Sequence, residues 1–397
     1  MMSLLNNSRN HRTTQRTMDY DIHGIVGVRL INPLDSDIAA VADLLEQYRA
    51  PLRREPDLVI RFKDDLPTPG LKHIGEGYAG FTEEGFYVLS KGRASVKACI
   101  PFEQIGSRCE ILHESGPRSV PLLTDIINYT FLSKGYIPLH ASAFVHNETG
   151  ILVAGWMHGG KTEALLAFAN HGAHYVGDEW VMLSPDGESM FGMPESLCIW
   201  DWYVKYIPKL LPRISMERKI LFKIIYIFDA IHKIFGRGIF EKFFPIKMLG
   251  EALPVFKQQL KVRVVPKALF KDRMRSQATP QKLFLIMGEN NSGIHIETCD
   301  PMEIADRMVG SNNYEQMYFW EFYEAFKFAF PHRRNDFLDN IDDRQRSLLM
   351  RALKNKEAYK ISHPYPVSFD ELFNKMQPLC NGAATKPVNQ LSIREHR

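Results

Sequence analysis

A glycine-rich loop followed by a lysine and a threonine offers the clearest chemistry in this sequence. Gly155, Gly160, Lys161 and Thr162 satisfy the pattern G-x-x-x-x-G-K-[ST]. A loop of this kind turns its backbone N–H groups toward phosphate oxygens, at the start of a helix whose dipole also favours negative charge. The segment therefore predicts a binding site for the phosphates of a nucleotide at residues 155–162.

Two adjacent acids form the second candidate group. Asp178 and Glu179 follow a short strand expected at Ala173–Val176, and Asp178 lies seventeen residues after Lys161. In folds that use nucleoside triphosphates, an acid at the tip of such a strand holds Mg²⁺ or activates a nucleophile. The alternative interpretation is an exposed turn. The complete phosphate loop upstream favours function, because a cation beside phosphates needs hard oxygen ligands.

His140 is the third candidate residue. It falls at or near the end of a strand expected at Tyr136–Val145, close to the start of the core. A single histidine on a strand is more often a hydrogen-bonded core residue than a catalytic one. The residues alone leave both interpretations open.

The elements around the loop fit the mechanism. Ile151–Ala154 is a short apolar run typical of a buried strand, and Lys161–His171 has apolar residues three and four positions apart, as in a helix. Gly172 is suited to end that helix. A strand, a phosphate loop and a helix in this order predict an α/β core.

The length of 397 residues exceeds one ordinary core and indicates two or three domains. Alternating apolar runs before residue 120 indicate a mixed, β-rich N-terminal domain with one helix near Asp35–Tyr48. The expected organisation is a flexible tail (1–17), the N-terminal domain (18–120), the phosphate-loop core (121–310), a C-terminal helical region (311–380) and a second flexible tail (381–397).

Residues 197–256 interrupt the core with apolar and basic residues that favour a helical insertion. We expect it to pack over the core, as amphipathic stretches of globular chains usually do. Two alternatives are contact with a membrane surface and binding of a partner peptide. The basic segment at 262–281 is either a solvated face or a source of a cation aimed at phosphates.

Composition limits the other function classes. A net charge of +3 gives no electrostatic case for nucleic acid. The five cysteines are scattered, with no spacing typical of zinc or a disulfide framework, which favours a reducing cytoplasm. The sequence has no uncharged apolar run of 18 residues and no apolar signal core, so we expect neither a membrane span nor secretion.

The segment from Leu139 to Leu183 resembles the HPr kinase/phosphorylase family, which is similar to phosphoenolpyruvate carboxykinase in its phosphate-loop core. The likeness consists of Leu139-His140 before a strand, fifteen residues from His140 to the first loop glycine, and the acidic pair after the loop lysine. It extends loosely to Glu297 and does not include the N-terminal domain or the insertion. The fold it implies is an α/β phosphate-loop kinase core.

The resemblance implies an ATP-dependent kinase that phosphorylates a hydroxyl of a protein, a peptide or a small molecule. Lys161 would hold the β- and γ-phosphates, and His140 would lie beside the reacting phosphoryl group. Mg²⁺ would be bound by Thr162 and the acidic pair, with Asp178 as the base and Glu179 on the metal side. The nucleotide would contact Gly155, Trp156, Met157, His158, Gly159, Gly160, Lys161 and Thr162.

The alternative is an ATP-binding regulator or scaffold without transfer activity. The loop is bulkier than the family's at Trp156, Met157 and His158, and Glu179 stands where the family has a second aspartate. The family's second, glycine-rich signature has no copy here. Gly159 and the tolerance of histidine for positive φ would supply the backbone freedom that the loop needs. The sequence does not select the acceptor, and it leaves homo-oligomerisation open.

Overall fold

The structure, a computed structural model, describes residues 16–75, 77–90, 96–116, 119–193, 195–235, 244–290 and 293–380, so nearly all of both expected tails lies outside the described residues. The chain is mixed α/β and divides into two compact units. Unit 1 comprises Met1–Pro138 and Asn313–Gln345, and unit 2 comprises Leu139–Asn312 and Arg346–Arg397. The expected C-terminal region, 311–380, is thus shared between the two units.

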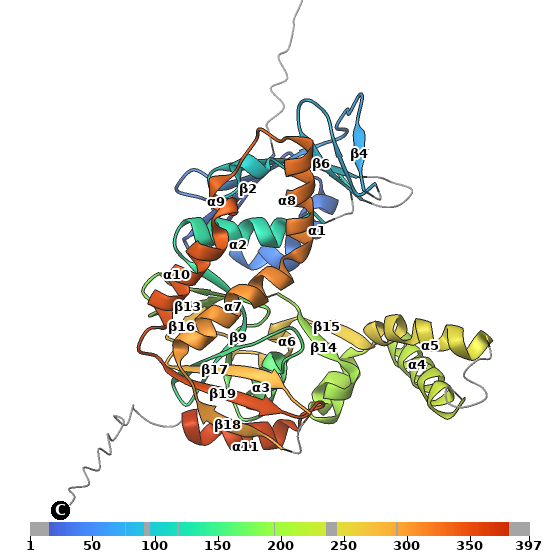
Figure 1. Ribbon diagram of the computed structural model, residues 1–397, viewed down its shortest axis with the longest axis vertical. Coiled ribbons are helices and arrows are strands. Elements are labelled where there is room, and N and C mark those ends of the chain that lie inside the picture. Colours follow the sequence, from blue (N-terminus) through green and yellow to red (C-terminus); the bar gives the residue numbers. More distant parts are fainter. Residues whose placement is uncertain are drawn as a thin grey trace, which may run out of the picture. The chain divides into compact units, whose positions relative to one another are not determined.

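Unit 1 contains one mixed sheet with strand order β1-β2-β3-β8-β7-β6-β5-β4. Its strands β2, β4 and β6 are labelled in Figure 1. Strands β2, β3 and β8 are parallel neighbours, and the other pairs are antiparallel. Its strands are β1 (Thr17–Ile22), β2 (Val26–Ile31), β3 (Leu58–Lys63), β4 (Lys72–Ile74), β5 (Ala79–Phe81), β6 (Phe86–Leu89), β7 (Lys97–Cys99) and β8 (Cys109–Glu114). Its helices are α1 (Asp35–Leu45), α2 (Leu123–Ser133), α8 (Met317–Ala329) and α9 (Asp336–Asp339), with 3-10 turns at Glu46–Tyr48 and Phe102–Gln104. Helix α10 (Ile341–Leu353) begins in unit 1 and ends in unit 2.

Aromatic side chains fill the core of unit 1. Phe102 is fully buried, and its ring centroid lies 5.3 Å from that of Phe326, 5.4 Å from that of Phe319 and 5.6 Å from that of Phe86. Phe319 and Phe326 belong to α8, so the aromatic density of this helix serves packing. Aromatic pairs at these separations add stability beyond the area they bury.

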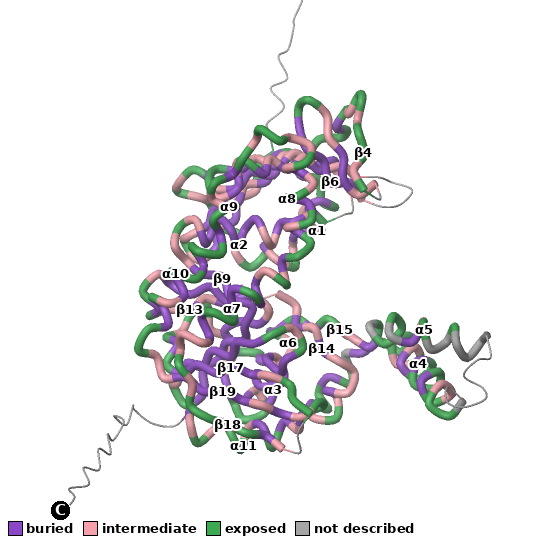
Figure 2. The backbone as a smooth tube through the Cα atoms, viewed as in Figure 1, coloured by how far each residue is buried: buried purple, intermediate pink, exposed green. Residues whose placement is uncertain are grey.

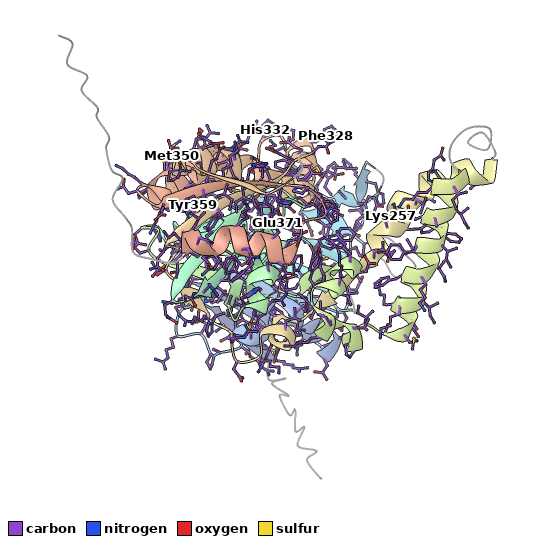
Figure 3. The ribbon with its side chains drawn as sticks, turned by 90° about the horizontal axis from the view of Figure 1, so that it is seen from below. Lys257, Phe328, His332, Met350, Tyr359 and Glu371 are labelled. Carbon is purple, nitrogen blue, oxygen red and sulfur yellow. The ribbon has the colours of Figure 1, made fainter. Side chains whose placement is uncertain are left out.

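We expect Phe102→Ala to lower the free energy of unfolding of unit 1 by about 3–5 kcal/mol, because the substitution leaves a cavity among these rings. The matched control is Phe328→Ala, because the side chain of Phe328 (labelled in Figure 3) is 74% exposed and fills no core. The control should change stability by about 0.5 kcal/mol or less. Urea unfolding followed by circular dichroism measures both, and equal effects of the two substitutions would contradict this description of the core.

Unit 2 is built on a second mixed sheet with strand order β16-β13-β12-β9-β10-β17-β19-β18, in which β11 also pairs with β9. The strands are β9 (Ile137–His146), β10 (Thr149–Ala154), β11 (His174–Gly177), β12 (Trp180–Leu183), β13 (Met190–Gly192), β16 (Gln277–Ala278), β17 (Lys282–Gly288), β18 (His295–Thr298) and β19 (Glu357–His363). A separate two-stranded ribbon consists of β14 (Leu197–Trp200) and β15 (Lys261–Val264). The helices are α3 (Lys161–Asn170), α4 (Met216–Phe235), α5 (Phe244–Lys257), α6 (Pro266–Phe270), α7 (Pro301–Glu315) and α11 (Phe369–Cys380), with 3-10 turns at Asp201–Lys205, Pro208–Arg213 and Gln258–Leu260.

The middle of this sheet is the rigid base of the candidate site. Strand β10 runs parallel to β17, and β17 runs parallel to β19. All residues of β9 are buried, as the purple tube in Figure 2 shows. Helices α3 and α11 pack against each other, with the ring centroids of Phe168 and Phe373 4.9 Å apart. The phosphate loop therefore leaves a buried central strand and enters a helix that is firmly packed.

The insertion differs from the expectation in two ways. It begins as a strand, β14, because Leu197 and Ile199 are buried and the strand pairs with β15. The expectation that it packs over the core is wrong for much of α4, where Ile220 is 52% and Ile227 is 57% exposed. Helix α4 packs instead against α5 (Figure 1).

A small cluster and ion pairs hold the hairpin of α4 and α5 together. Phe222 and Ile225 of α4 are buried with Ile214 and Leu260 near the ribbon. The Nζ atom of Lys257, labelled in Figure 3, lies 2.6 Å from Oδ1 of Asp229. The membrane-surface and partner-peptide interpretations of this segment stay predictions.

No helix in the described part of the chain is long and apolar enough to cross a membrane. The five cysteines are all free thiols.

Candidate functional site

The phosphate loop connects β10 to α3, and its glycines are required by close contacts. A Cβ atom on Gly155 would lie 2.4 Å from the carbonyl oxygen of Ile286 in β17. Gly160 has φ +111° and directly precedes α3, and a Cβ atom there would lie 2.4 Å from Nε2 of His363. Both positions exclude a side chain, so the glycines of the sequence pattern have a steric reason in this fold.

The bulky residues lie at the tip of the loop. The side chains of Trp156 and His158 are exposed, whereas Gly159 and Gly160 are buried. His158 has φ +58°, so a histidine adopts the left-handed conformation here. Gly159 is required for a different reason, because a Cβ atom at this position would lie only 2.9 Å from the carbonyl oxygen of Trp156. The bulky side chains Trp156 and His158 therefore lie at the exposed end of the loop.

Lys161 lies at the base of the loop. It is 6% exposed, and its Nζ atom donates hydrogen bonds to the carbonyl oxygens of Gly155, at 3.1 Å, and Trp156, at 2.8 Å. The first N–H groups of a helix have no partners within the helix. A cation and the N–H groups at the start of α3 are thus next to each other, as anion binding requires.

Asp178 joins the acidic pair to the loop. Oγ1 of Thr162 donates a hydrogen bond to Oδ2 of Asp178 at 3.0 Å, and Oγ of Ser142 donates to Oδ1. Asp178 is 2% exposed. Burial, and next the charge of Glu179, raise the pKa of Asp178 to about 7, against the opposing effects of the two hydroxyls and Lys161. A carboxylate with such a pKa can accept a proton near neutral pH.

Glu179 and His140 form the other half of the site. Nε2 of His140 lies 3.3 Å from Oε2 of Glu179, and this contact, more than any other, lowers the pKa of Glu179. His140 is 4% exposed, and its backbone N–H donates to Oδ1 of Asn312 at 3.1 Å. Glu179 has φ +65°, a conformation that costs about 1–3 kcal/mol in a residue with a side chain. The chain therefore tolerates strain at the residue that keeps both carboxylates beside the loop.

The structure thus brings together the residues that the sequence singled out. Thr162 contacts Asp178, and His140 contacts Glu179, the residue that follows Asp178 in the chain. The charge of Lys161 acts on both carboxylates. Among residues 16–380, excluding the undescribed gaps, no group of three or more His, Cys, Asp or Glu side chains is arranged to hold a metal ion by itself.

The donor set nevertheless suits Mg²⁺ in company with a nucleotide. Mg²⁺ usually takes one or two carboxylates and fills its other positions with water and substrate phosphates. Asp178, Glu179 and the hydroxyl of Thr162 offer oxygen ligands of this kind. The residues present therefore fit Mg²⁺ bound together with phosphate oxygens.

Sequence reasoning missed several residues that support the site. His363 of β19 is buried behind the loop, with Nε2 2.8 Å from the carbonyl oxygen of Gly159. Oγ of Ser311 in α7 donates to the carbonyl oxygen of Gly155 at 3.1 Å. Ser142 is the easiest of these residues to find from the sequence, because it lies two positions after His140 and so on the same face of β9.

Glu163 is a further buried acid beside the loop. It is the last residue of the run Gly160-Lys161-Thr162-Glu163 and lies in the first turn of α3. Burial raises its pKa, although Tyr203 donates a hydrogen bond to it. The side chain therefore belongs to the packed interior under the loop.

Two arginines of the basic segment at 262–281 make structural contacts. Nη1 of Arg273 donates to the carbonyl oxygens of Ala169 and Ala173, at 3.0 Å each. Arg275 pairs with Glu148. Arg273 and Arg275 are therefore bound to other groups of the protein and do not point a free charge at a phosphate site.

No protein-family model matches this chain, and no curated protein is significantly similar to it in sequence.

We expect Gly160→Ala to lower the affinity for ATP by about tenfold or more. The new methyl group would clash with His363 and would shift the first turn of α3, which follows Gly160 directly. The matched control is Gly172→Ala at the other end of α3. Gly172 also has positive φ, at +88°, but a Cβ atom there would meet no atom within 4 Å, so the control should keep nucleotide affinity. Titration with a fluorescent ATP analogue compares the two, and equal losses would contradict the role given to Gly160.

Proposed function

We propose that the chain is an ATP-dependent kinase that transfers the γ-phosphate to a hydroxyl group. The observation that carries the proposal is the hydrogen bond between Thr162 and Asp178, because it joins a glycine-rich anion-binding loop to a carboxylate with a pKa of about 7. Phosphoryl transfer needs these two parts beside each other: a holder for phosphates and cation, and a group that takes a proton from the acceptor.

In the proposed mechanism, each residue has a defined task. The N–H groups at the start of α3 and the ammonium group of Lys161 bind phosphate oxygens. Thr162 and the acidic pair would hold Mg²⁺, which would supply positive charge to neutralise the phosphates. Asp178 takes the proton of the acceptor hydroxyl, whose oxygen forms the new bond to the γ-phosphorus while the bond to the β,γ-bridging oxygen breaks. Glu179 stays charged because its pKa is lowered, and His140 orients it.

ATP binding and ATP consumption, measured side by side, test this function. The protein should bind ATP with Mg²⁺ and should form ADP in the presence of a pool of candidate acceptors that carry hydroxyl groups. The pool includes proteins, peptides and small molecules, since fold and loop do not choose among them. The absence of ATP binding would refute the proposal. The free thiols agree with a reducing compartment, and we propose the cytoplasm.

The alternative, an ATP-binding regulator or scaffold, is favoured by one observation. Lys161 donates hydrogen bonds to two loop carbonyls, so it must leave these partners to reach a γ-phosphate. Binding of ATP without turnover, with every acceptor class supplied, would favour the regulator.

A further inference from the structure

The ribbon of β14 and β15 has one apolar face and one polar face. Leu197, Ile199 and Val264 are buried in the main core of unit 2. Residues directly opposite in an antiparallel pair project to the same side. Trp200 pairs with Lys261, and Cys198 pairs with Arg263, so these four side chains share the other face. The ribbon therefore carries two cations on this face, together with Trp200, whose ring is partly buried and packs against the core.

Trp200 connects this polar face to the tip of the phosphate loop. The ring centroids of Trp200 and His158 are 5.7 Å apart with an interplanar angle of 62°, an edge-to-face contact. Nζ of Lys261 lies over the same indole ring, 4.4 Å from its centroid. A cation held over an aromatic face is restricted in position without being neutralised. Lys261 is therefore held close to the loop through one intervening ring.

The charge of Lys261 is available for a ligand. Within the described ranges, Lys261 makes no salt bridge, in contrast to Arg275 and Lys282, which pair with Glu148 and Glu357. Through Trp200 and His158, the side chain lies beside the tip of the loop that would hold the phosphates.

We propose that Lys261 binds the terminal phosphate of the nucleotide held by residues 155–162, reaching it from the polar face of the ribbon. The ligand class is the γ-phosphate of a nucleoside triphosphate, so the inference rests on the proposed function and deepens it. Lys161 then holds the phosphates from the base of the loop and Lys261 from its outer side. The ribbon in this way provides selectivity for a nucleoside triphosphate over a diphosphate, because only the triphosphate has a γ-phosphate.

Equilibrium binding of ATP and ADP, each with Mg²⁺, tests the proposal on four proteins: the parent, Lys261→Met, Lys261→Arg and Lys205→Met. Methionine keeps a flexible apolar stem over Trp200 and removes the charge, whereas arginine keeps the charge. Lys205 is the matched control, because its Nζ also lies over an aromatic ring, 5.4 Å from the centroid of Tyr206.

Lys261→Met should lower the affinity for ATP by about tenfold or more, the usual cost of losing one charged hydrogen bond, and should change the affinity for ADP much less. Lys261→Arg and Lys205→Met should bind both nucleotides like the parent. Equal effects of Lys261→Met on ATP and ADP, or no effect on either, would overturn the inference while leaving the kinase proposal intact. Failure of the parent to bind ATP would overturn both.

Discussion

Replacing Lys161 by alanine is expected to lower the rate of phosphate transfer by about 10²–10³-fold while the fold is kept. The ammonium group is the cation placed at the base of the loop, and its charge acts on both Asp178 and Glu179. Loss of one preorganised charged donor at a transferring phosphoryl group costs about 10²–10³-fold in rate. Consumption of ATP under saturating nucleotide, compared with the parent, measures the effect.

Two controls separate catalysis from folding in this experiment. Lys161→Met keeps the side-chain stem that fills space below the loop, and it should be as inactive as the alanine variant. Lys209→Ala makes the same change of net charge at an exposed position in the same unit and should keep the parental rate. A folded Lys161→Ala protein with the parental rate would show that the loop does not hold the transferred phosphate.

Asp178→Asn is expected to have opposite effects on activity and stability. The amide cannot take a proton, and loss of a general base lowers the rate by about 10²–10⁴-fold. The buried carboxylate is also costly to the fold, because burial raises its pKa from 3.8 to about 7. The variant should therefore be less active and more stable than the parent at alkaline pH.

The sign of the stability effect follows from proton linkage. Below pH 3.8 the carboxyl group is protonated in both the folded and the unfolded protein, so it does not change the free energy of unfolding. Between pH 3.8 and about 7 the unfolded state loses the proton first, and the parent loses stability as pH rises. Above about pH 7 the carboxyl group is charged in both states, and the loss of stability is complete. Denaturation of the Mg²⁺-free proteins at about pH 5 and about pH 8 should show that Asp178→Asn gains more at the higher pH.

Glu179→Gln is the matched comparison, because the pKa of Glu179 is lowered. A lowered pKa means that the charged group contributes stability above its unfolded pKa, which is lost as pH falls. The glutamine variant should therefore lose stability at about pH 8, in contrast to Asp178→Asn. Parallel effects of the two substitutions would contradict the environments described for the acidic pair.

The local parts of the site could be predicted from the sequence. The strand expected at Ile151–Ala154 runs over Thr149–Ala154, and the helix expected at Lys161–His171 runs over Lys161–Asn170. These elements follow from residues that are adjacent in the chain: an apolar run, a glycine loop and apolar residues at helical spacing. The same local signals place Asp178 and Glu179 directly after a strand.

The remaining parts depend on contacts between distant segments. His363 and Ser311 reach the loop because β19 pairs with β17 and α7 follows β18, and no spacing within the sequence indicates this order. Lys261 lies just before the basic segment at 262–281. The number of basic residues in a segment does not show which of them form ion pairs and which could bind a ligand. The error about α4 has a similar origin, because an amphipathic pattern identifies an apolar face and not what covers it.

A crystal structure of the protein with a non-hydrolysable ATP analogue and Mg²⁺ tests the central claim most directly. We predict that the β- and γ-phosphates lie against the N–H groups of residues 159–162, with Lys161 turned toward them and Mg²⁺ between Thr162 and Asp178. Phosphates bound elsewhere on the chain, or a loop that remains unchanged with saturating analogue and Mg²⁺ present, would contradict it.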